Sequence, residues 1–400
     1  MGILIDPPSW SAHGRWWSHL VSDRSVSELH GFAAAQGIPR RGFERDHYDV
    51  PSEYYDVLVA AGATPVSPRE VVQRLSDSGL RRRKAQAMAR RVPGHALLRP
   101  RHLEPGDVVA VPAPAGPVPA DGLRAGVQRL QSWGLQVRVG DHVLDRHTEL
   151  GYLAGDDADR AADFTKAWMD PEVSAVMLAR GGYGTQRMLD LLDWRRLAEP
   201  EPKVLVGFSD VTALHQACAA RLGLATVHSH VVTSLGRASE GSAQTLRTTL
   251  MQPEPGVDLL AGSEVTTLVG GTGSGVLVGG NLALLAAEIG TPYSRPGRAG
   301  IVVLEDVTED PYRVDRMLTQ LIRSGWFDQV TGIVVGQFTD CGPPAAVAAT
   351  LADRLAPLGV PLVSGFDFGH TQTTATVPLG VSAVLDADRG SLVVSDPPLL

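Results

Sequence analysis

From residue 106 onward, short apolar segments alternate with segments of helical periodicity, and this alternation limits the possible folds more than any other feature of the chain. The first apolar run, 107–113, is closed by proline and glycine. Short strands separated by helices of this length predict a parallel sheet covered by helices on both faces. The expected elements are strand 107–113, helix 122–133, strand 135–139, helix 156–168, strand 175–179, helix 185–192, strand 203–207 and helix 211–222.

A second set of alternating elements follows after an interruption. Between 231 and 278 the pattern becomes polar and glycine-rich, with one expected helix near 243–251. Regular periodicity returns at 280–289. The strands expected beyond it are 300–305, 330–336 and 361–365, with helices at 312–325 and 345–356. Three short segments near the C-terminus, at 376–379, 381–386 and 391–394, predict antiparallel strands joined by turns.

The first 80 residues differ from the rest, since they hold three of the seven tryptophans and four of the twelve histidines. Two helices are expected there, at 26–36 and 68–78, with Ser25 and Ser67 as N-caps and Gly37 and Gly79 at the C-terminal ends. No acidic residue occurs between Leu80 and Leu103, where several arginines cluster. The resulting domain boundaries are a small domain 1–82, a basic linker 83–104, an α/β domain 105–235, a connecting segment 236–275 and a C-terminal domain 276–400.

Composition excludes several classes of protein. With 44% hydrophobic and 20% charged residues, the chain is neither disordered nor fibrous. No apolar run approaches the ~18–20 residues of a membrane span, and a net charge of −8 argues against a whole-chain nucleic-acid binder. The two cysteines show no metal-ligand spacing. With no recognisable secretory signal, we expect a cytoplasmic protein.

Candidate functional residues lie at or just after the ends of four expected strands. Ser209 comes after strand 203–207 and before a helix, where open α/β sheets place their ligands. Taken alone, however, the local sequence favours a helix-capping role for Ser209 or Asp210. Two adjacent glycines, Gly181 and Gly182, follow strand 175–179, which suits an anion cradle, an oxyanion wall or a plain tight turn. Glu305 ends strand 300–305 and His370 follows strand 361–365.

Serine, glutamate and histidine at three strand ends form a chemically coherent set. Ser209 supplies a nucleophile, His370 a general base and Glu305 a carboxylate to orient the base. No two-carboxylate metal motif, His-Glu-x-x-His or Cys-x-x-Cys motif competes with this set for the chemistry. The sequence therefore favours acyl transfer through a serine nucleophile.

From about residue 105 to its end, the chain resembles the LD-carboxypeptidases, a serine-peptidase family that includes microcin C immunity peptidases. The matching segments, in family order, are 106–117, 179–184, 206–212, 279–282, 304–306 with 311–316, and 369–371. The resemblance implies a flavodoxin-like parallel-sheet domain that carries the nucleophile, a second α/β domain with a β-rich C-terminal end, and a small N-terminal α/β domain before them. It also implies a homodimer.

The resemblance also implies roles for individual residues. Ser209, Glu305 and His370 would form the catalytic triad, and the backbone amides of Asp210 and Gly182 the oxyanion hole. The residues expected to bind substrate are Arg180, Gly181, Tyr183 and Asn281. One departure from the family is the segment 228–230, which reads His-Ser-His where relatives commonly read His-Gly-Pro; it puts the shape of the loop beside the nucleophile in question.

The N-terminal segments 5–20 and 45–49 resemble a small bacterial domain of unknown function. Its histidines, aspartates and arginines predict either a metal or nucleotide site, or a hydrogen-bonded core.

The expected activity of the whole chain is removal of a terminal D-amino acid from an L-centre in a peptidoglycan-derived peptide. We expect no metal or organic cofactor, and no nucleic acid or membrane as partner of the catalytic part. Two alternatives remain. One is hydrolysis of an acylated nucleotide antibiotic, disfavoured because 231–278 has no aromatic residue to stack on a base; the other is a nucleotide-binding module on a hydrolase scaffold.

Overall fold

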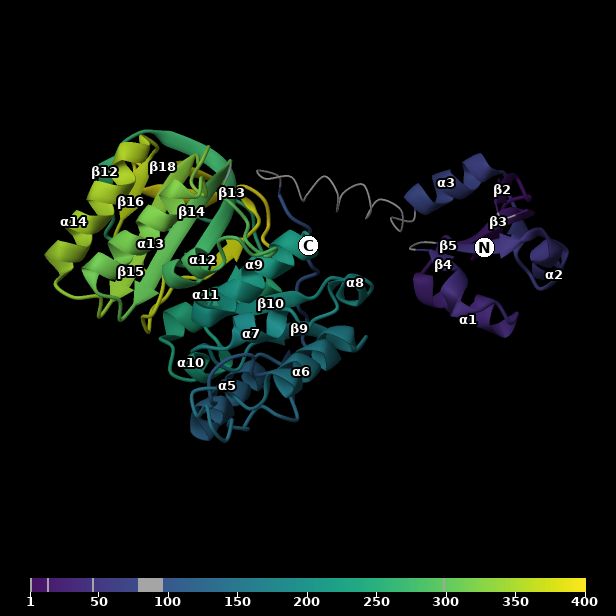
Figure 1. Ribbon diagram of the computed structural model, residues 1–400, viewed down its shortest axis with the longest axis horizontal. Coiled ribbons are helices and arrows are strands. Elements are labelled where there is room, and N and C mark those ends of the chain that lie inside the picture. Colours follow the sequence, from purple (N-terminus) through teal and green to yellow (C-terminus); the bar gives the residue numbers. More distant parts are fainter. Residues whose placement is uncertain (1, 13, 45–46, 78–95, 298) are drawn as a thin grey trace. The chain divides into compact units, whose positions relative to one another are not determined.

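The structure is a computed structural model that describes residues 2–12, 14–44, 47–77, 96–297 and 299–400 (Figure 1). It divides into two compact units, 1–89 and 90–400. The basic cluster of the expected linker, at 81–91, lies outside the described residues, as does Gly79. Every helix in the described ranges is too short or too polar to cross a membrane.

In its described residues, the N-terminal unit is a six-stranded sheet packed with three α-helices. The sheet runs in the order β4-β5-β3-β1-β6, with β2 paired to β3, and among these described pairs only β1 and β6 are parallel. Both expected helices are present, and the hydroxyls of Ser25 and Ser67 accept hydrogen bonds from the N–H groups of Glu28 and Glu70. Its elements are β1 (Ile3–Ile5), β2 (Trp10–Ala12), β3 (Arg15–Ser22), α1 (Val26–Ala35), η1 (Arg40–Gly42), β4 (Phe43–Glu44), β5 (His47–Pro51), η2 (Ser52–Tyr54), α2 (Tyr55–Ala60), β6 (Thr64–Pro65) and α3 (Pro68–Asp77).

The first sheet of the larger unit has the strand order β17-β11-β10-β9-β7-β8. Numbered along the chain, its five parallel strands follow the order 2-1-3-4-5, which is that of flavodoxin-like folds. The predicted architecture is confirmed. The elements of this part are β7 (Val108–Val111), α5 (Ala120–Ser132), β8 (Gln136–Val139), α6 (Asp157–Met169), β9 (Val173–Met177), α7 (Thr185–Leu189), α8 (Trp194–Leu197), β10 (Val204–Gly207), η3 (Ser209–Val211), α9 (Thr212–Arg221), β11 (Thr226–His228), α10 (Val232–Leu235) and α11 (Glu240–Met251).

The strands of this sheet are apolar throughout because both faces are covered. Ala175 and Met177 of β9 pack toward α5, α10 and α11, whereas Val176 of β9 and Leu178, which directly follows the strand, pack toward α6, α7 and α9. A strand with two buried faces carries a continuous apolar run rather than an alternating one. This is the pattern from which the sheet was predicted.

The second sheet has the order β12-β16-β15-β14-β13-β18-β19, with a parallel centre and antiparallel edges. Helices α12, α13 and α14 cover one face (Figure 1). The β-rich C-terminal end is confirmed. The elements of this part are β12 (Thr266–Val269), β13 (Thr272–Asn281), α12 (Leu282–Ala287), β14 (Gly300–Val307), α13 (Pro311–Arg323), β15 (Gly332–Thr339), α14 (Pro344–Leu355), η4 (Ala356–Leu358), β16 (Leu362–Ser364), β17 (Val377–Leu379), β18 (Ser382–Asp386) and β19 (Ser391–Val394).

Two segments pair with parts of the chain that lie outside their expected domain or linker. Strand β17 leaves the C-terminal part and pairs antiparallel with β11 at the edge of the first sheet. The end of the expected linker, 97–103, is likewise part of the larger unit, since Leu97 and Leu98 donate backbone hydrogen bonds to Gly380 and Gly223. Both segments are held by backbone pairing with residues distant in sequence, which no local pattern reveals.

The connecting segment 236–275 is also more regular than expected. Helix α11 packs its buried side chains into the core of the first sheet, and β12 forms an edge of the second sheet. Strand β13 begins in the glycine-rich stretch and runs as a central strand. A Cβ on Gly273 or Gly279 would lie 1.9 or 2.0 Å from the carbonyl oxygen of Thr331 or Val303, respectively. Glycine marks close backbone approach here, not irregular structure.

Candidate active site

Ser209 stands immediately after the carboxyl end of β10, on a sharply turned backbone. Its φ is 65°, in the left-handed region that non-glycine residues rarely adopt. Such a conformation costs on the order of 1–3 kcal/mol and is characteristic of functional turns. Ser209 is the first residue of η3, which leads directly into α9, so the hydroxyl lies near the start of a helix.

Three side chains predicted from separate strand ends meet at this turn. His370 Nε2 lies 2.9 Å from the Ser209 hydroxyl, and His370 Nδ1 lies 2.7 Å from Oε2 of Glu305. Glu305 comes from β14 and is fully buried, whereas His370 follows β16 and is partly accessible. Because the carboxylate accepts a hydrogen bond from Nδ1–H, Nε2 is left without a proton and can accept that of the serine hydroxyl.

The electrostatic surroundings of His370 favour its charged form. Burial lowers the pKa of the imidazole, but the hydrogen bond and charge of Glu305 outweigh it, so that the pKa is raised above 6.5. Asp306 adds a smaller influence in the same direction. The imidazolium that would form when Ser209 loses its proton is therefore stabilised before any substrate arrives.

Two glycines, Gly181 and Gly369, leave room for the side chains of Ser209 and Glu305. A Cβ on Gly181 would lie 3.0 Å from Cβ of Ser209 and 3.2 Å from its hydroxyl oxygen. A Cβ on Gly369, whose φ is +126°, would lie 2.8 Å from Oε2 of Glu305. Side chains at these positions would displace the nucleophile or the carboxylate.

The carboxylates next to the cluster organise the backbone. Asp210 is buried, and its Oδ2 accepts a hydrogen bond of 2.8 Å from the N–H of Thr185 at the start of α7. Burial raises the pKa of Asp210. Asp306 accepts hydrogen bonds from the Asn281 side chain and the backbone of Ala283, and burial raises its pKa to about 6.

Asn281 does not fit the substrate-binding role expected of it. Its amide nitrogen donates to Asp306, and its oxygen accepts from the N–H of Leu284 as the N-cap of α12. The residue is buried, with both side-chain polar atoms engaged inside the protein. It is a structural link between β13, β14 and α12.

The segment 228–230, which departs from the family pattern, is buried behind the candidate nucleophile. Burial, together with the neighbouring His215 and His370, lowers the pKa of His228 well below 6.5. Ser229 hydrogen-bonds Thr376, and His230 Nε2 lies 2.8 Å from the hydroxyl of Ser242. The departure thus ties the loop after β11 to the C-terminal part and to α11.

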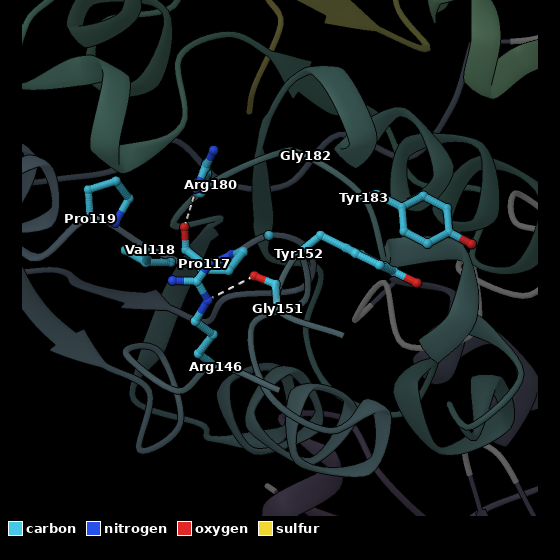
Figure 2. A pocket seen from close by; sticks show the side chains of 10 residues that line it. Pro117, Val118, Pro119, Arg146, Gly151, Tyr152, Arg180, Gly182 and Tyr183 are labelled. Atoms are coloured by element: carbon cyan, nitrogen blue, oxygen red, sulfur yellow. Dashed lines mark hydrogen bonds between the residues drawn. The ribbon is translucent and has the colours of Figure 1, made fainter. Parts of the chain in front are cut away.

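A cavity of about 870 Å³ lies beside Gly182, the neighbour of the glycine that packs against the serine (Figure 2). Arg180 and Tyr183, both expected to bind substrate, also line it. Arg146 and Tyr152, from the loop that follows β8, were not predicted. They could have been found from the rule that ligands bind beyond the carboxyl ends of the strands, at the point where the strand order reverses. In this sheet the order reverses between β7 and β9.

The larger unit matches a known family. Residues 109–229 match the model of the LD-carboxypeptidase N-terminal domain, and residues 274–385 match that of the C-terminal domain. A Streptomyces coelicolor protein named as a carboxypeptidase is 53% identical over 305 residues, which cover 76% of this chain and 98% of the relative. The chain belongs to the LD-carboxypeptidase family. It is therefore an enzyme of the carboxypeptidase class.

Other members of the LD-carboxypeptidase family extend the comparison. The murein tetrapeptide carboxypeptidase of Pseudomonas aeruginosa is 37% identical over 292 residues, covering 70% of this chain and 94% of the relative. The crystal structure of the muramoyltetrapeptide carboxypeptidase from Oxalobacter formigenes is 32% identical, with a TM-score of 0.64, and covers 73% of this chain and 99% of that one. A microcin immunity (MccF)-like protein from Bacillus anthracis, 24% identical with a TM-score of 0.69 over 75% of this chain and 99% of its own, shares the fold.

The N-terminal unit matches a different family. Residues 3–78 match the model of a protein of unknown function, DUF4031. The two LD-carboxypeptidase models begin only at residue 109. The chain therefore combines two families.

Proposed function

We propose that this LD-carboxypeptidase hydrolyses the amide bond between an L-centre and a terminal D-amino acid in peptidoglycan-derived peptides, in murein tetrapeptide recycling in the cytoplasm. The observation that carries the proposal is the hydrogen-bonded chain from Ser209 through His370 to Glu305. Relatives that are 35–37% identical are named for murein peptides, which supports the substrate class.

In this reaction Ser209 Oγ attacks the carbonyl carbon of the scissile amide while Nε2 of His370 takes its proton. Glu305 holds the proton on Nδ1 and stabilises the imidazolium. His370 then protonates the leaving amine, and the D-amino acid departs from an acyl-enzyme. Water, deprotonated by the same histidine, attacks the ester and releases the shortened peptide.

The backbone amides of Asp210 and Gly182 are the proposed donors to the oxyanion. Asp210 directly follows the nucleophile at the start of η3, and Gly182 lines the cavity. The φ of Gly182 is +115°, and a Cβ there would lie 3.3 Å from Cα of Gly116. Such a position suits a backbone group presented closely to the substrate.

The cavity suits a peptide that carries carboxylates. Arg146 and Arg180 both line it, and each is held in place by a backbone carbonyl, that of Gly151 or Pro117 (Figure 2). Guanidinium groups recognise carboxylates through paired hydrogen bonds. We assign these two arginines to the substrate peptide.

The direct test is mass spectrometry of the protein incubated with a muropeptide tetrapeptide. We expect release of D-alanine and accumulation of the tripeptide, with no release by the Ser209→Ala variant. Intact tetrapeptide after prolonged incubation with folded wild-type protein would contradict the proposal. The expected homodimer stays a prediction, which light scattering after size exclusion would test.

One observation favours a second candidate, an acylated nucleotide. Tyr152 and Tyr183 line the cavity with half-exposed rings whose centroids are 5.9 Å apart. Exposed aromatic rings provide stacking surfaces for a nucleobase, and one solved MccF structure holds glutamyl sulfamoyl guanosine. Including an aminoacyl sulfamoyl adenosine in the same assay distinguishes the two: faster cleavage of the nucleotide than of the tetrapeptide would favour this candidate.

A further inference from the structure

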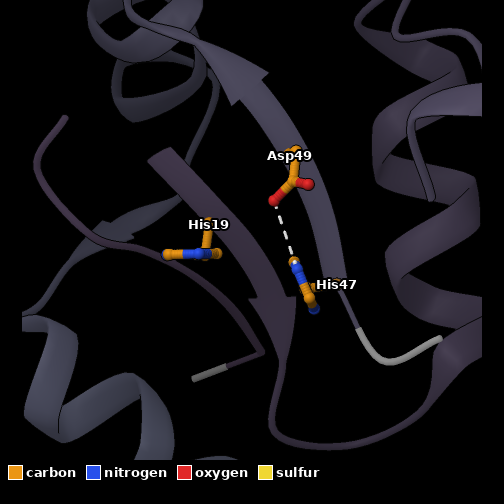
Figure 3. Close-up of side chains that lie close together, drawn as sticks. All are labelled: His19, His47 and Asp49. Atoms are coloured by element: carbon orange, nitrogen blue, oxygen red, sulfur yellow. Dashed lines mark ion pairs between the residues drawn. The ribbon is translucent and has the colours of Figure 1, made fainter. Parts of the chain in front are cut away.

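A group of possible metal ligands lies on one face of the N-terminal sheet. His19 of β3 is the direct cross-strand partner of Asp49 on β5, and His47 precedes Asp49 by two residues on the same strand (Figure 3). Side chains two apart on a strand point to the same face. Tyr48 and Val50, the alternate residues of β5, are buried in the core, which leaves His47 and Asp49 on the opposite, accessible face.

The distances within this group suit one bound ion. One ligand atom from each of His19, His47 and Asp49 lies within 4.8 Å of the others. His47 Nε2 and Asp49 Oδ1 are 3.2 Å apart, and two ligand atoms at about 2.0–2.1 Å from a tetrahedral zinc ion lie roughly 3.3 Å apart. Apart from this ion pair, Oδ1 of Asp49 is buried and accepts no hydrogen bond within the described ranges.

A carboxylate holds the ring of His19 in place, as is usual for histidines that bind metals. Asp6, which is fully buried, contacts Nδ1 of His19 at 2.8 Å and accepts a hydrogen bond of 2.5 Å from its backbone N–H. Trp10 stacks on the imidazole with a centroid separation of 5.8 Å. A carboxylate on one ring nitrogen fixes the tautomer and directs the other nitrogen, here Nε2, toward an ion.

We propose that the N-terminal unit binds one divalent transition-metal ion, zinc or a metal of similar preference, through His19, His47 and Asp49. Two imidazoles and one carboxylate are ligands that zinc and iron accept readily, whereas magnesium and calcium prefer oxygen alone. Three protein ligands leave at least one coordination position for water or another ligand. The proposal does not rest on the proposed peptidase reaction, because these ligands belong to the other family and the other compact unit.

A simpler explanation is an ordinary ion pair between His47 and Asp49. Such a pair accounts for the 3.2 Å contact, but it does not require His19 opposite or a buried carboxylate behind that ring. The surface pair of His142 and Asp145, 2.8 Å apart in the other unit, shows this ordinary arrangement and provides a matched control.

The experiment uses the full chain, stripped with a chelator, dialysed and titrated with Zn²⁺ in a calorimeter, with metal content measured by mass spectrometry. We expect one high-affinity zinc ion per chain, and a dissociation constant raised at least ~100-fold in His47→Ala and Asp49→Asn. Asp6→Asn, which alters only the support of His19, should weaken binding by about 10–100-fold. His142→Ala should bind as the wild type does.

A spectroscopic arm separates this site from adventitious binding. Co²⁺ in place of zinc should give visible absorption bands in the wild type and His142→Ala, and lose them in His47→Ala. Circular dichroism must show each variant folded; if one is not, the other ligand variants answer the question. Metal content well below one per chain in the wild type, or unchanged affinity in folded His47→Ala and Asp49→Asn, would overturn the proposal.

Discussion

Replacing Glu305 by glutamine tests the proposed reaction most directly, because it removes a charge and keeps the shape of the side chain. Oε2 of Glu305 lies 2.7 Å from Nδ1 of His370 and is shielded from water, since the glutamate is fully buried. At an effective dielectric constant of about 20, a unit charge 3–4 Å from the imidazolium contributes about 4–6 kcal/mol. At 1.36 kcal/mol per factor of ten, we expect kcat to fall by about 10³–10⁴.

The pH dependence of the Glu305→Gln variant provides a second, independent test of the proposed reaction. In the wild type, kcat/KM should rise as His370 loses its proton, with a midpoint above 6.5 because Glu305 raises that pKa. In the Glu305→Gln variant, burial still lowers the pKa of His370, and only the weaker influence of Asp306 raises it. The midpoint of the residual activity should therefore move to lower pH.

The assay for both effects is D-alanine release from a muropeptide tetrapeptide, measured from pH 5 to pH 9 at equal folded concentration. Glu288→Gln is the matched control: Glu288 is also buried, but its carboxylate contacts Gln186 and Thr291 and not the histidine. We expect this control to retain the wild-type profile. Activity of Glu305→Gln within tenfold of wild type, or a midpoint that stays or moves upward, would refute the reasoning.

Three further outcomes are expected. Ser209→Ala and His370→Ala should each lower kcat by at least ~10³, and the double variant should be little worse, because the residues act as a unit. Gly181→Ala should lower kcat by about tenfold or more while the protein stays folded, since its Cβ would press on the nucleophile; steady-state kinetics and circular dichroism measure this. A fragment 96–400 should fold and keep kcat, whereas 105–400 should lose on the order of 3–6 kcal/mol of stability with two buried leucines, as urea unfolding would show.

Each of these three predictions has a control variant or a result that would contradict it. Multiplicative losses in the double variant would indicate that the serine and histidine act separately. Gly241→Ala serves for the glycine test, because a Cβ there meets nothing within 4 Å and the residue lies in helix α11. The leucines lost from the shorter fragment are Leu97 and Leu103; equal stability of the two fragments would show that these contacts contribute little. A folded 96–400 without turnover would show that the N-terminal unit completes the active site.

Local sequence was sufficient to place the three candidate catalytic residues at the ends of strands. The apolar runs before Ser209, Glu305 and His370 are continuous because their strands are buried on both faces, so each strand end could be recognised without neighbours. The serine caps of α1 and α3 were visible for the same reason, since a cap depends on residues three apart.

Tertiary pairing decided the remainder. The glycines of β13 resemble a loop in isolation, yet carbonyl oxygens of Thr331 and Val303 approach so closely that only glycine fits. Strand β17 and the segment 97–103 gain their places from backbone hydrogen bonds to partners more than 100 residues away.

The two sites show the same division. Arg146 and Tyr152 reach the cavity from a loop without regular pattern, through the order of the strands beneath it. His19 and Asp49 were both noted in the sequence, but only the register of β3 against β5 sets them side by side. Periodicity is a property of one segment, whereas register and strand order are set by the free energy of packing segments that the sequence keeps apart.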